Sequence, residues 1–145
     1  MKYFTAIAAA FALGVLVTAA GVPMTVHYIN HDAVASTMVK GGQIISDNGL
    51  IVLANRAVQS EAEMHAKTNH VFIIVDGEAD FITGGTIIDP KIISAGQTRG
   101  SGIEGGTLRH LTKGDIIAIP AKTPHQWKDT SKTGSVCYYA VNYTT

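Results

Sequence analysis

The sequence is poor in cysteine and in charge of either sign. The first shortage limits how the fold can be stabilised, and the second limits which partners the protein can bind. It holds a single cysteine, Cys137, so no disulfide can form within the chain and a core must stabilise the fold. Lysine plus arginine and aspartate plus glutamate each number 11, which gives a formal net charge of zero. No basic cluster accompanies that balance, so the sequence argues against a nucleic-acid partner. The 46% of hydrophobic residues indicates one globular domain.

A hydrophobic run long enough to span a bilayer, about 20 residues, is also lacking. The N-terminal apolar stretch, residues 4–17, instead has the features of a secretory signal peptide. Lys2 precedes it, and the small residues Thr18-Ala19-Ala20 follow it. We therefore expect residues 1–20 to be a signal peptide cleaved near Ala20, and the mature chain to be secreted or periplasmic without membrane contact. An uncleaved N-terminal anchor is the alternative.

No β-α-β rhythm is visible, which disfavours a nucleotide-binding α/β fold. Short strand-like runs instead recur between turn signals such as Asp47-Asn48-Gly49 and Asp76-Gly77, a pattern typical of an all-β sandwich or barrel. Strands are expected at residues 44–45, 50–58, 61–65, 71–75, 78–83, 107–111, 116–119, 125–128 and 135–142.

Residues 21–42 are expected to precede this barrel, which takes residues 43–145. Within the leading segment, Thr25–Ile29 is predicted to be a short strand. Asn30 can cap the N-terminus of a short helix over Ala33–Lys40, which the following glycines would end.

Residues 84–106 depart from the pattern of short turns. The segment is rich in glycine, and a stretch of this length with little predicted structure is either disordered or a lid over the barrel mouth. Arg99 and Glu104 within it would contact a substrate or pair with each other.

Four potential metal ligands fall on strands that can face one another. Glu63 and His65 are two residues apart, so on a strand both side chains leave the same face. His70 opens the next antiparallel strand, and His125 follows a Pro-bounded loop later in the chain. Imidazole and carboxylate suit borderline divalent metals, so closure of a barrel would create a site for one such ion. This ligand set does not distinguish Fe, Mn, Zn, Ni and Cu.

The other histidines lack a partner at ligand spacing and are interpreted as surface or core residues: His27, His31 and His110.

The segment with the first three ligands resembles the first motif of the cupin superfamily, whose members are small jelly-roll β-barrels with a central metal. That motif reads Gly, five residues, His-x-His, three or four residues, Glu, six residues, Gly. Here Glu63 stands at the first His, His65 at the second and His70 at the Glu, and Gly77 closes the motif. Ala57 stands where the opening Gly is expected.

The segment with the fourth ligand resembles the second cupin motif, Gly-x5-Pro-x-Gly-x2-His-x3-Asn. Gly114, Pro120 and His125 match it, while Lys122 and Asp129 replace its second Gly and its Asn. With both motifs, the resemblance covers residues 43–142 and implies a single cupin-type jelly-roll barrel.

The resemblance also implies that Glu63, His65, His70 and His125 surround one divalent metal ion. The role of Glu63 stays open: it would be a direct ligand, orient His65 or His70, or act as a catalytic base beside the metal.

Two functions follow from this resemblance. The first is a metal-dependent enzyme of the dioxygenase, isomerase or lyase type that acts on a small organic molecule inside the barrel. The second is a non-catalytic protein that binds a metal or a small ligand. The resemblance implies a homodimer as well, because cupin barrels often pair through their sheet edges.

Further side chains are candidates for a substrate pocket. With His70 inward, alternation turns Phe72 inward, and with His125 inward it turns Trp127 inward. The two rings would line the pocket or fill the core. Arg56 lies in a strand where an inward guanidinium would hold an anionic substrate, and where an outward one would face solvent.

Overall fold

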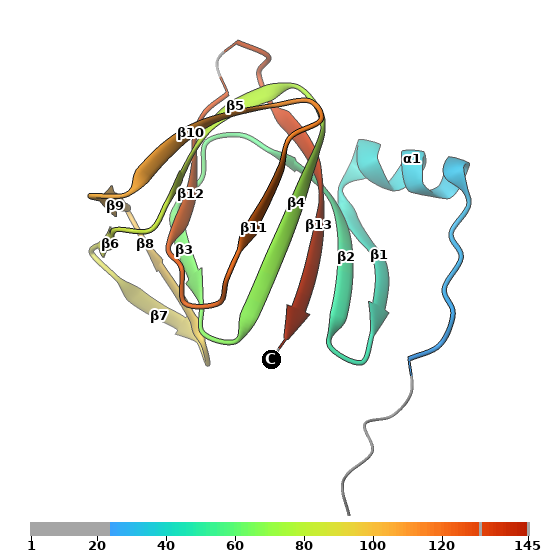
Figure 1. Ribbon diagram of the computed structural model, residues 1–145, viewed down its shortest axis with the longest axis horizontal. Helices are drawn as coiled ribbons and strands as arrows, with labels where there is room; N and C mark the ends of the chain where they lie inside the picture. Colours follow the sequence, from blue (N-terminus) through green and yellow to red (C-terminus); the bar gives the residue numbers. More distant parts are fainter. Residues whose placement is uncertain (1–23, 131, 145) are drawn as a thin grey trace, which may run out of the picture.

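In the computed structural model, which describes residues 24–130 and 132–144, the chain forms a jelly-roll barrel preceded by one helix (Figure 1). The all-β prediction is thereby confirmed. The elements are α1 (His31–Lys40), β1 (Gly42–Asp47), β2 (Leu50–Ala57), β3 (Ala62–His65), β4 (Thr68–Asp76), β5 (Glu78–Thr83), β6 (Thr86–Ile88), β7 (Lys91–Ser94), β8 (Gln97–Gly100), β9 (Gly102–Glu104), β10 (Thr107–Thr112), β11 (Ile116–Ile119), β12 (His125–Asp129) and β13 (Val136–Thr144). Among the described residues, no helix is long and apolar enough to cross a membrane.

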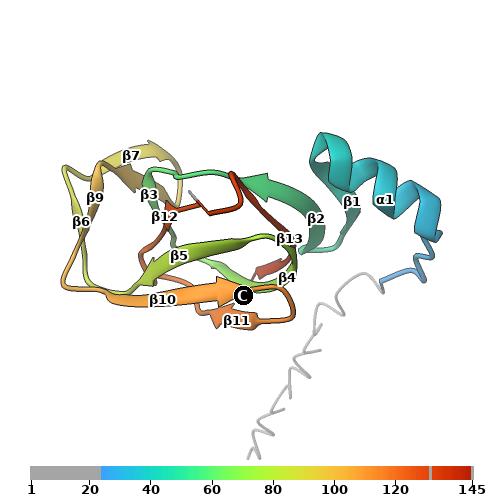
Figure 2. The same cartoon turned by 90° about the horizontal axis from the view of Figure 1, so that it is seen from above.

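Two antiparallel sheets make the barrel. One has the strand order β1-β2-β13-β4-β11 and the other β10-β5-β12-β3-β8-β7. They enclose a common interior, with α1 beyond the β1 edge (Figure 2). A separate ribbon of β6 and β9 lies at the opposite end of the molecule. Strands from both sheets therefore face one space.

The main core fills the space between the sheets. Its buried members are Phe72, Ile74, Ala79, Phe81, Leu111, Ile119, Trp127, Val136, Tyr138 and Ala140. Along β4 the buried residues are His70, Phe72 and Ile74, which confirms the predicted inward face of that strand. Ile119 of β11 and Asn142 of β13 lie opposite His70, so the histidine is enclosed on both sides of its own sheet.

A second, smaller core decides which way β3 faces. It consists of Ala62, Ile87 and Ile103, with Met64 and Ile82 packed against it. Ala62 and Met64 leave β3 on the face that this core covers. Strand alternation then turns Glu63 and His65 to the other face, toward the barrel interior.

The expectation of a weakly structured segment at residues 84–106 is wrong. This segment forms β6 to β9: β8 pairs with β3, β7 pairs with β8, and β6 pairs with β9. The glycines belong to the turns and close contacts of these very short strands, which the local pattern did not reveal. Arg99 lies near Glu61 and Glu63, whereas the sequence left it either to contact a substrate or to pair with Glu104.

The predicted strand at Thr25–Ile29 is also wrong, because residues 24–30 belong to no strand. The Thr25 backbone N–H donates to a side-chain oxygen of Asp47 at 2.8 Å instead of to a strand partner. The helix prediction is confirmed, with α1 beginning two residues earlier than expected. Asn30 caps it by accepting from the Ala33 backbone N–H at 2.9 Å.

The tight β4–β5 turn makes a prediction about stability. Gly77 has φ +74°, and a Cβ atom there would collide with the Ser135 carbonyl oxygen. Gly84 has φ +76° and nothing within 4 Å of such a Cβ. Gly84→Ala should therefore lower the free energy of unfolding by about 1 kcal/mol through backbone strain alone. Gly77→Ala should lower it by about 3 kcal/mol. Urea denaturation measures both, and equal losses would show that the chain relieves the collision at Gly77 without cost.

Candidate metal centre

Three histidines from three strands meet inside the barrel. His65 ends β3, His70 lies on β4, and His125 opens β12. One ring nitrogen of each residue lies within 4.8 Å of those of the other two. The centroid of the His70 ring is 4.9 Å from that of His65 and 5.2 Å from that of His125. The predicted convergence of these three imidazoles is what the structure shows.

Sheet register explains why distant residues meet. His125 of β12 lies directly opposite Glu63 of β3 within the six-stranded sheet. Residues directly opposite on neighbouring strands point to the same face, so His125, Glu63 and His65 share one wall of the barrel. His70 approaches from the five-stranded sheet across the interior.

Two of the imidazoles are oriented through their Nδ1 atoms. The Nδ1 of His70 is 2.7 Å from Asn142 Oδ1, and the Nδ1 of His125 is 3.0 Å from the Thr123 carbonyl oxygen. A carbonyl can only accept, so the Nδ1 of His125 carries the proton. The same assignment for His70 pairs its Nδ1–H with the amide oxygen. In the neutral form of each ring, the lone pair is then on Nε2.

The Nε2 atoms of His70 and His125 are buried without a hydrogen-bond partner. A buried polar atom that lacks a partner is costly, and such atoms are rare in native structures. A bound cation would supply the missing partner, and metal-ligating histidines characteristically donate their other N–H to a carbonyl or carboxylate. The donor set and its orientation therefore fit a divalent metal.

Burial keeps His70 and His65 in the neutral form that binds metal. Desolvation lowers the pKa of His70 to about 4, an effect that the neighbouring His125 and His65 reinforce. Desolvation also lowers the pKa of His65, although Glu63 opposes that shift. At neutral pH the two side chains are uncharged and can donate a lone pair.

Glu63 lies beside the imidazoles. Its Oε1 is 3.4 Å from His125 Nε2, at the far limit of a hydrogen bond, and its Oε2 is 3.7 Å from His65 Nε2. Burial favours the protonated acid, but the contact with His125 and the electrostatic effect of His125, His65 and Arg99 outweigh it, so the pKa of Glu63 lies below its ordinary value. The carboxylate is ionised next to the histidine cluster, although it is not a member of the three-residue group.

The two predicted pocket aromatics lie beneath the cluster. The ring centroid of Phe72 is 5.5 Å from that of His70 and 6.1 Å from that of Trp127, on which it stacks. The indole N–H of Trp127 donates to Tyr138 Oη at 3.2 Å. Both predicted residues are only 5% exposed, so they form the floor of the site as part of the main core.

Arg56 is not brought to the cluster. Its Nε donates to Ser135 Oγ at 2.8 Å and its side chain is exposed. The preceding residue, Asn55, hydrogen-bonds Tyr138 in the core, so alternation turns Arg56 to the outer face of the sheet.

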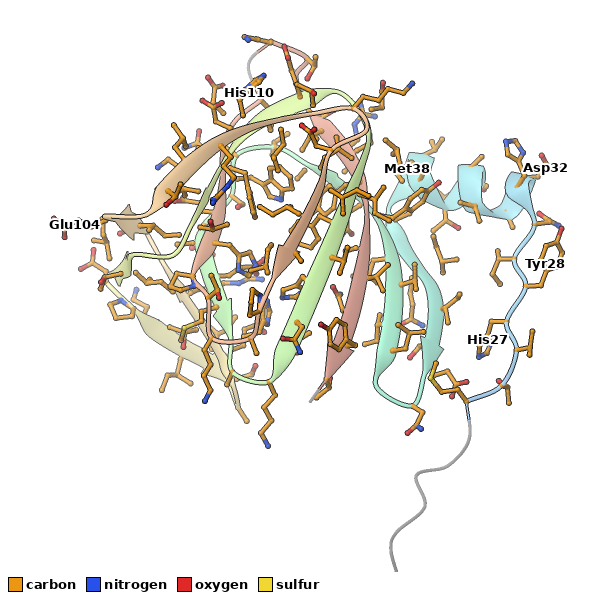
Figure 3. The ribbon with its side chains drawn as sticks, in the orientation of Figure 1. His27, Tyr28, Asp32, Met38, Glu104 and His110 are labelled. Atoms are coloured by element: carbon orange, nitrogen blue, oxygen red, sulfur yellow. The ribbon has the colours of Figure 1, made fainter. Side chains whose placement is uncertain are left out.

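The remaining histidines lie elsewhere. His27 contacts Asp47 at the side of the barrel, beyond β1, His31 begins α1, and His110 lies on the outside of the barrel (Figure 3). His110 stands between two carboxylates, 2.7 Å from Asp80 and 3.0 Å from Glu78, and these contacts raise its pKa.

The sequence did not reveal the side chains that support the cluster from β13 and β8. Asn142 reaches His70 only because β13 lies beside β4, 72 residues along the chain. Gln97 lies opposite His65, and Arg99 opposite Glu63, through the β3–β8 pairing. A cavity of about 340 Å³ is lined by His65 together with Lys67, Gln97 and their neighbours, so His65 is the member of the cluster that is accessible from this side.

Solved structures with a similar fold support this architecture. The chain superposes on the crystal structure of FeII HppE with a TM-score of 0.53 and 17% identity, over 71% of this chain and 50% of that one. It resembles hydroxypropylphosphonic acid epoxidase from S. wedmorenis in complex with fosfomycin equally well, with a TM-score of 0.53 and 17% identity over 74% and 53% of the two chains. The chain thus spans about half the length of these proteins.

A third structure is an uncharacterized conserved protein with a double-stranded β-helix domain from Klebsiella pneumoniae. The TM-score is 0.51 and the identity 15%, over 70% of this chain and 69% of that one. No family model and no curated protein matches the sequence. At these identities the likeness establishes the fold alone, and it agrees with the jelly roll that the sequence motifs predict.

The depressed pKa of His70 predicts how the metal-free protein responds to acid. Between pH 6.5 and about 4 the unfolded chain binds a proton that folded His70 does not. The contribution of His70 to the free energy of unfolding is therefore complete above pH 6.5 and is lost as the pH falls toward 4, by about 2–3 kcal/mol. Urea denaturation at a series of pH values should give a shallower slope in this range for His70→Gln.

His110→Gln is the matched control. The raised pKa of His110 makes its contribution complete below pH 6.5 and lost as the pH rises above that value. Its replacement should leave the slope below pH 6.5 unchanged. The same slope for His70→Gln and for the unaltered protein would contradict the assignment.

Proposed function

We propose that this protein, which has the cupin jelly-roll fold, is an exported protein that binds one divalent metal through His65, His70 and His125. The observation that supports the metal most strongly is the pair of buried Nε2 atoms, on His70 and His125, that have no hydrogen-bond partner, the one on His125 lying 3.4 Å from Glu63 Oε1. Their convergence with a nitrogen of His65 within 4.8 Å completes a set of three imidazoles. Three protein ligands leave room for a further molecule on the metal, which is typical of catalytic rather than structural sites.

We further propose that the metal serves an enzyme acting on a small organic molecule, of the dioxygenase, isomerase or lyase type. A divalent ion at this position would supply Lewis-acid or redox chemistry. Glu63 is ionised and lies against two of the imidazoles, so it can accept a proton from a molecule bound at the barrel mouth, or join the ligands. Phe72 and Trp127 close the interior below and keep water away from that side.

A non-catalytic metal-binding or ligand-binding role is the second candidate. It is favoured by the exchange of Glu and His relative to the cupin motif, since Glu63 stands outside the group of three histidines. Turnover of small acids or diols by the iron- or manganese-loaded protein would favour the enzyme. Tight metal binding without any such turnover would favour the second role.

The metal itself is tested by titrating the protein with Zn²⁺, Fe²⁺ and Mn²⁺ and by elemental analysis. One ion per chain is expected, and His65→Ala, His70→Ala and His125→Ala should each weaken binding at least about 100-fold. His110→Ala is the matched control and should bind as the unaltered protein does. Equal affinity in all four variants, or no metal binding at all, would overturn the proposal.

Glu63→Gln in the same titration separates the roles of the carboxylate. The amide keeps the shape of the side chain but cannot accept a proton or bind a metal as an anion. A loss of about 10-fold or more in metal affinity identifies Glu63 as a ligand. Unchanged affinity with lost turnover identifies it as the base.

Export and dimer formation complete the proposal. The outer face of the five-stranded sheet carries an apolar row, Ile116, Ile73 and Tyr139, in which Ile116 is 66% exposed. An apolar surface of this kind suits a second copy of the chain.

Intact-mass measurement of protein recovered from the producing cells should give a chain starting near Gly21, and sedimentation should give twice its mass. Ile116→Lys should yield the monomer, and an unprocessed monomeric chain would refute both points.

A further inference from the structure

A row of charged side chains runs from the histidine cluster out along the six-stranded sheet. His125 of β12 lies opposite Glu63 of β3, Glu63 lies opposite Arg99 of β8, and Arg99 lies opposite Lys91 of β7. Directly opposed residues share a face of the sheet. The face that carries Glu63 and His65 therefore continues outward to Arg99 and Lys91.

Arg99 and Lys91 form an unusual pair. Like charges directly opposite each other on neighbouring strands destabilise a sheet. The carboxylates nearest to Arg99 lie at long range: Glu61 Oε2 is 3.6 Å from its Nη1, and Glu63 Oε2 is 4.0 Å from its Nε. A well-formed guanidinium–carboxylate contact is about 2.7–2.9 Å long, so the donors of Arg99 are not fully used.

The two cations also line a cavity. It has a volume of about 280 Å³ and is lined by Glu61, Asp89, Lys91, Ile93, Arg99, Gly100 and Ser101. That volume is close to the lower end of small-molecule sites, about 300 Å³. Of its two carboxylates, Asp89 accepts a hydrogen bond from Ser101 at 3.2 Å. Glu61 is 67% exposed and makes only the long contact with Arg99.

We propose that Arg99 and Lys91 form a subsite for an oxyanion, the carboxylate or phosphonate group of a small molecule whose other end reaches the histidine cluster. The planar guanidinium of Arg99 suits two parallel hydrogen bonds to such a group, and the ammonium of Lys91 adds a second positive charge. In the absence of ligand the carboxylate of Glu61 lies next to Arg99, and the anionic group of the ligand would displace it. That the far end of the ligand meets a metal rests on the function proposed above, whereas the subsite itself does not.

The subsite is tested on the metal-free protein with acetate and methylphosphonate as probes and acetamide as the uncharged analogue of acetate. Chemical shifts of the Arg99 side-chain Nε–H and of the Lys91 and Gly100 backbone amides report binding. Saturable shifts are expected with the anions and not with acetamide. Arg99→Gln should weaken binding about 10-fold, since it removes the bidentate donor.

Two further variants sharpen the test. Glu61→Gln removes the competing carboxylate and should tighten anion binding about 3-fold, in line with the weak pairing of exposed charges. Arg56→Gln removes an arginine from the outer face and should change nothing. The proposal is overturned if acetamide binds as acetate does, if Arg99→Gln behaves as Arg56→Gln does, or if Glu61→Gln weakens binding.

Zn²⁺ titration of the same samples distinguishes the two possible failures. Zn²⁺ binding without anion binding would overturn the subsite and leave the metal centre standing. Anion binding without Zn²⁺ binding would overturn the metal centre and leave the subsite standing. Where both bind, acetate should bind more tightly to the Zn²⁺-loaded protein, because the ion adds positive charge beside Glu63. Binding linkage then requires that acetate raise the affinity for Zn²⁺ by the same factor.

Discussion

The direction in which β3 faces is the constraint on which the site depends. Ala62 and Met64 pack into the small core beneath the β6–β9 ribbon, and this packing turns Glu63 and His65 toward the interior. A shift of one residue in the pairing of β3 would carry both ligand candidates to the outside and leave His70 and His125 without their neighbours. The ribbon therefore supports the metal centre although none of its residues approaches the histidines as a ligand.

Electrostatics at the site follow from the same placement. Burial lowers the pKa values of His70 and His65, and the carboxylate of Glu63 beside them is ionised. Arg99 lies opposite that carboxylate on the next strand and helps to keep it ionised. The arrangement presents lone pairs on one side and positive charge on the other. A ligand with one metal-binding end and one anionic end would match both.

Much of this could be predicted from local patterns, because alternation and turn chemistry act over a few residues. The inward face of β4 and the Asp76-Gly77 turn follow from such patterns. The convergence of the three histidines was expected only with barrel closure and the resemblance to the cupin motifs. Residues 84–106 were misjudged because strands of three or four residues carry almost no periodic signal. Their pairing partners, β3 among them, lie elsewhere in the chain.

The contacts that orient the site could not be predicted for a related reason. Asn142 meets His70 across a strand pair 72 residues apart, and no local pattern marks an asparagine as the partner of a histidine. For Arg56 the strand was expected, but the sequence did not decide whether its side chain points inward or outward. That orientation depends on Asn55, the preceding residue, which reaches Tyr138 in the core.

The floor of the site has one more consequence. Trp127 is the only tryptophan in the sequence, it is almost fully buried, and it stacks on Phe72, whose ring lies near those of both His70 and His125. All indole fluorescence of the protein therefore originates a few side chains from the histidines. A paramagnetic ion arriving there would quench that emission, so the chain carries its own optical reporter of metal occupancy, with no dye attached.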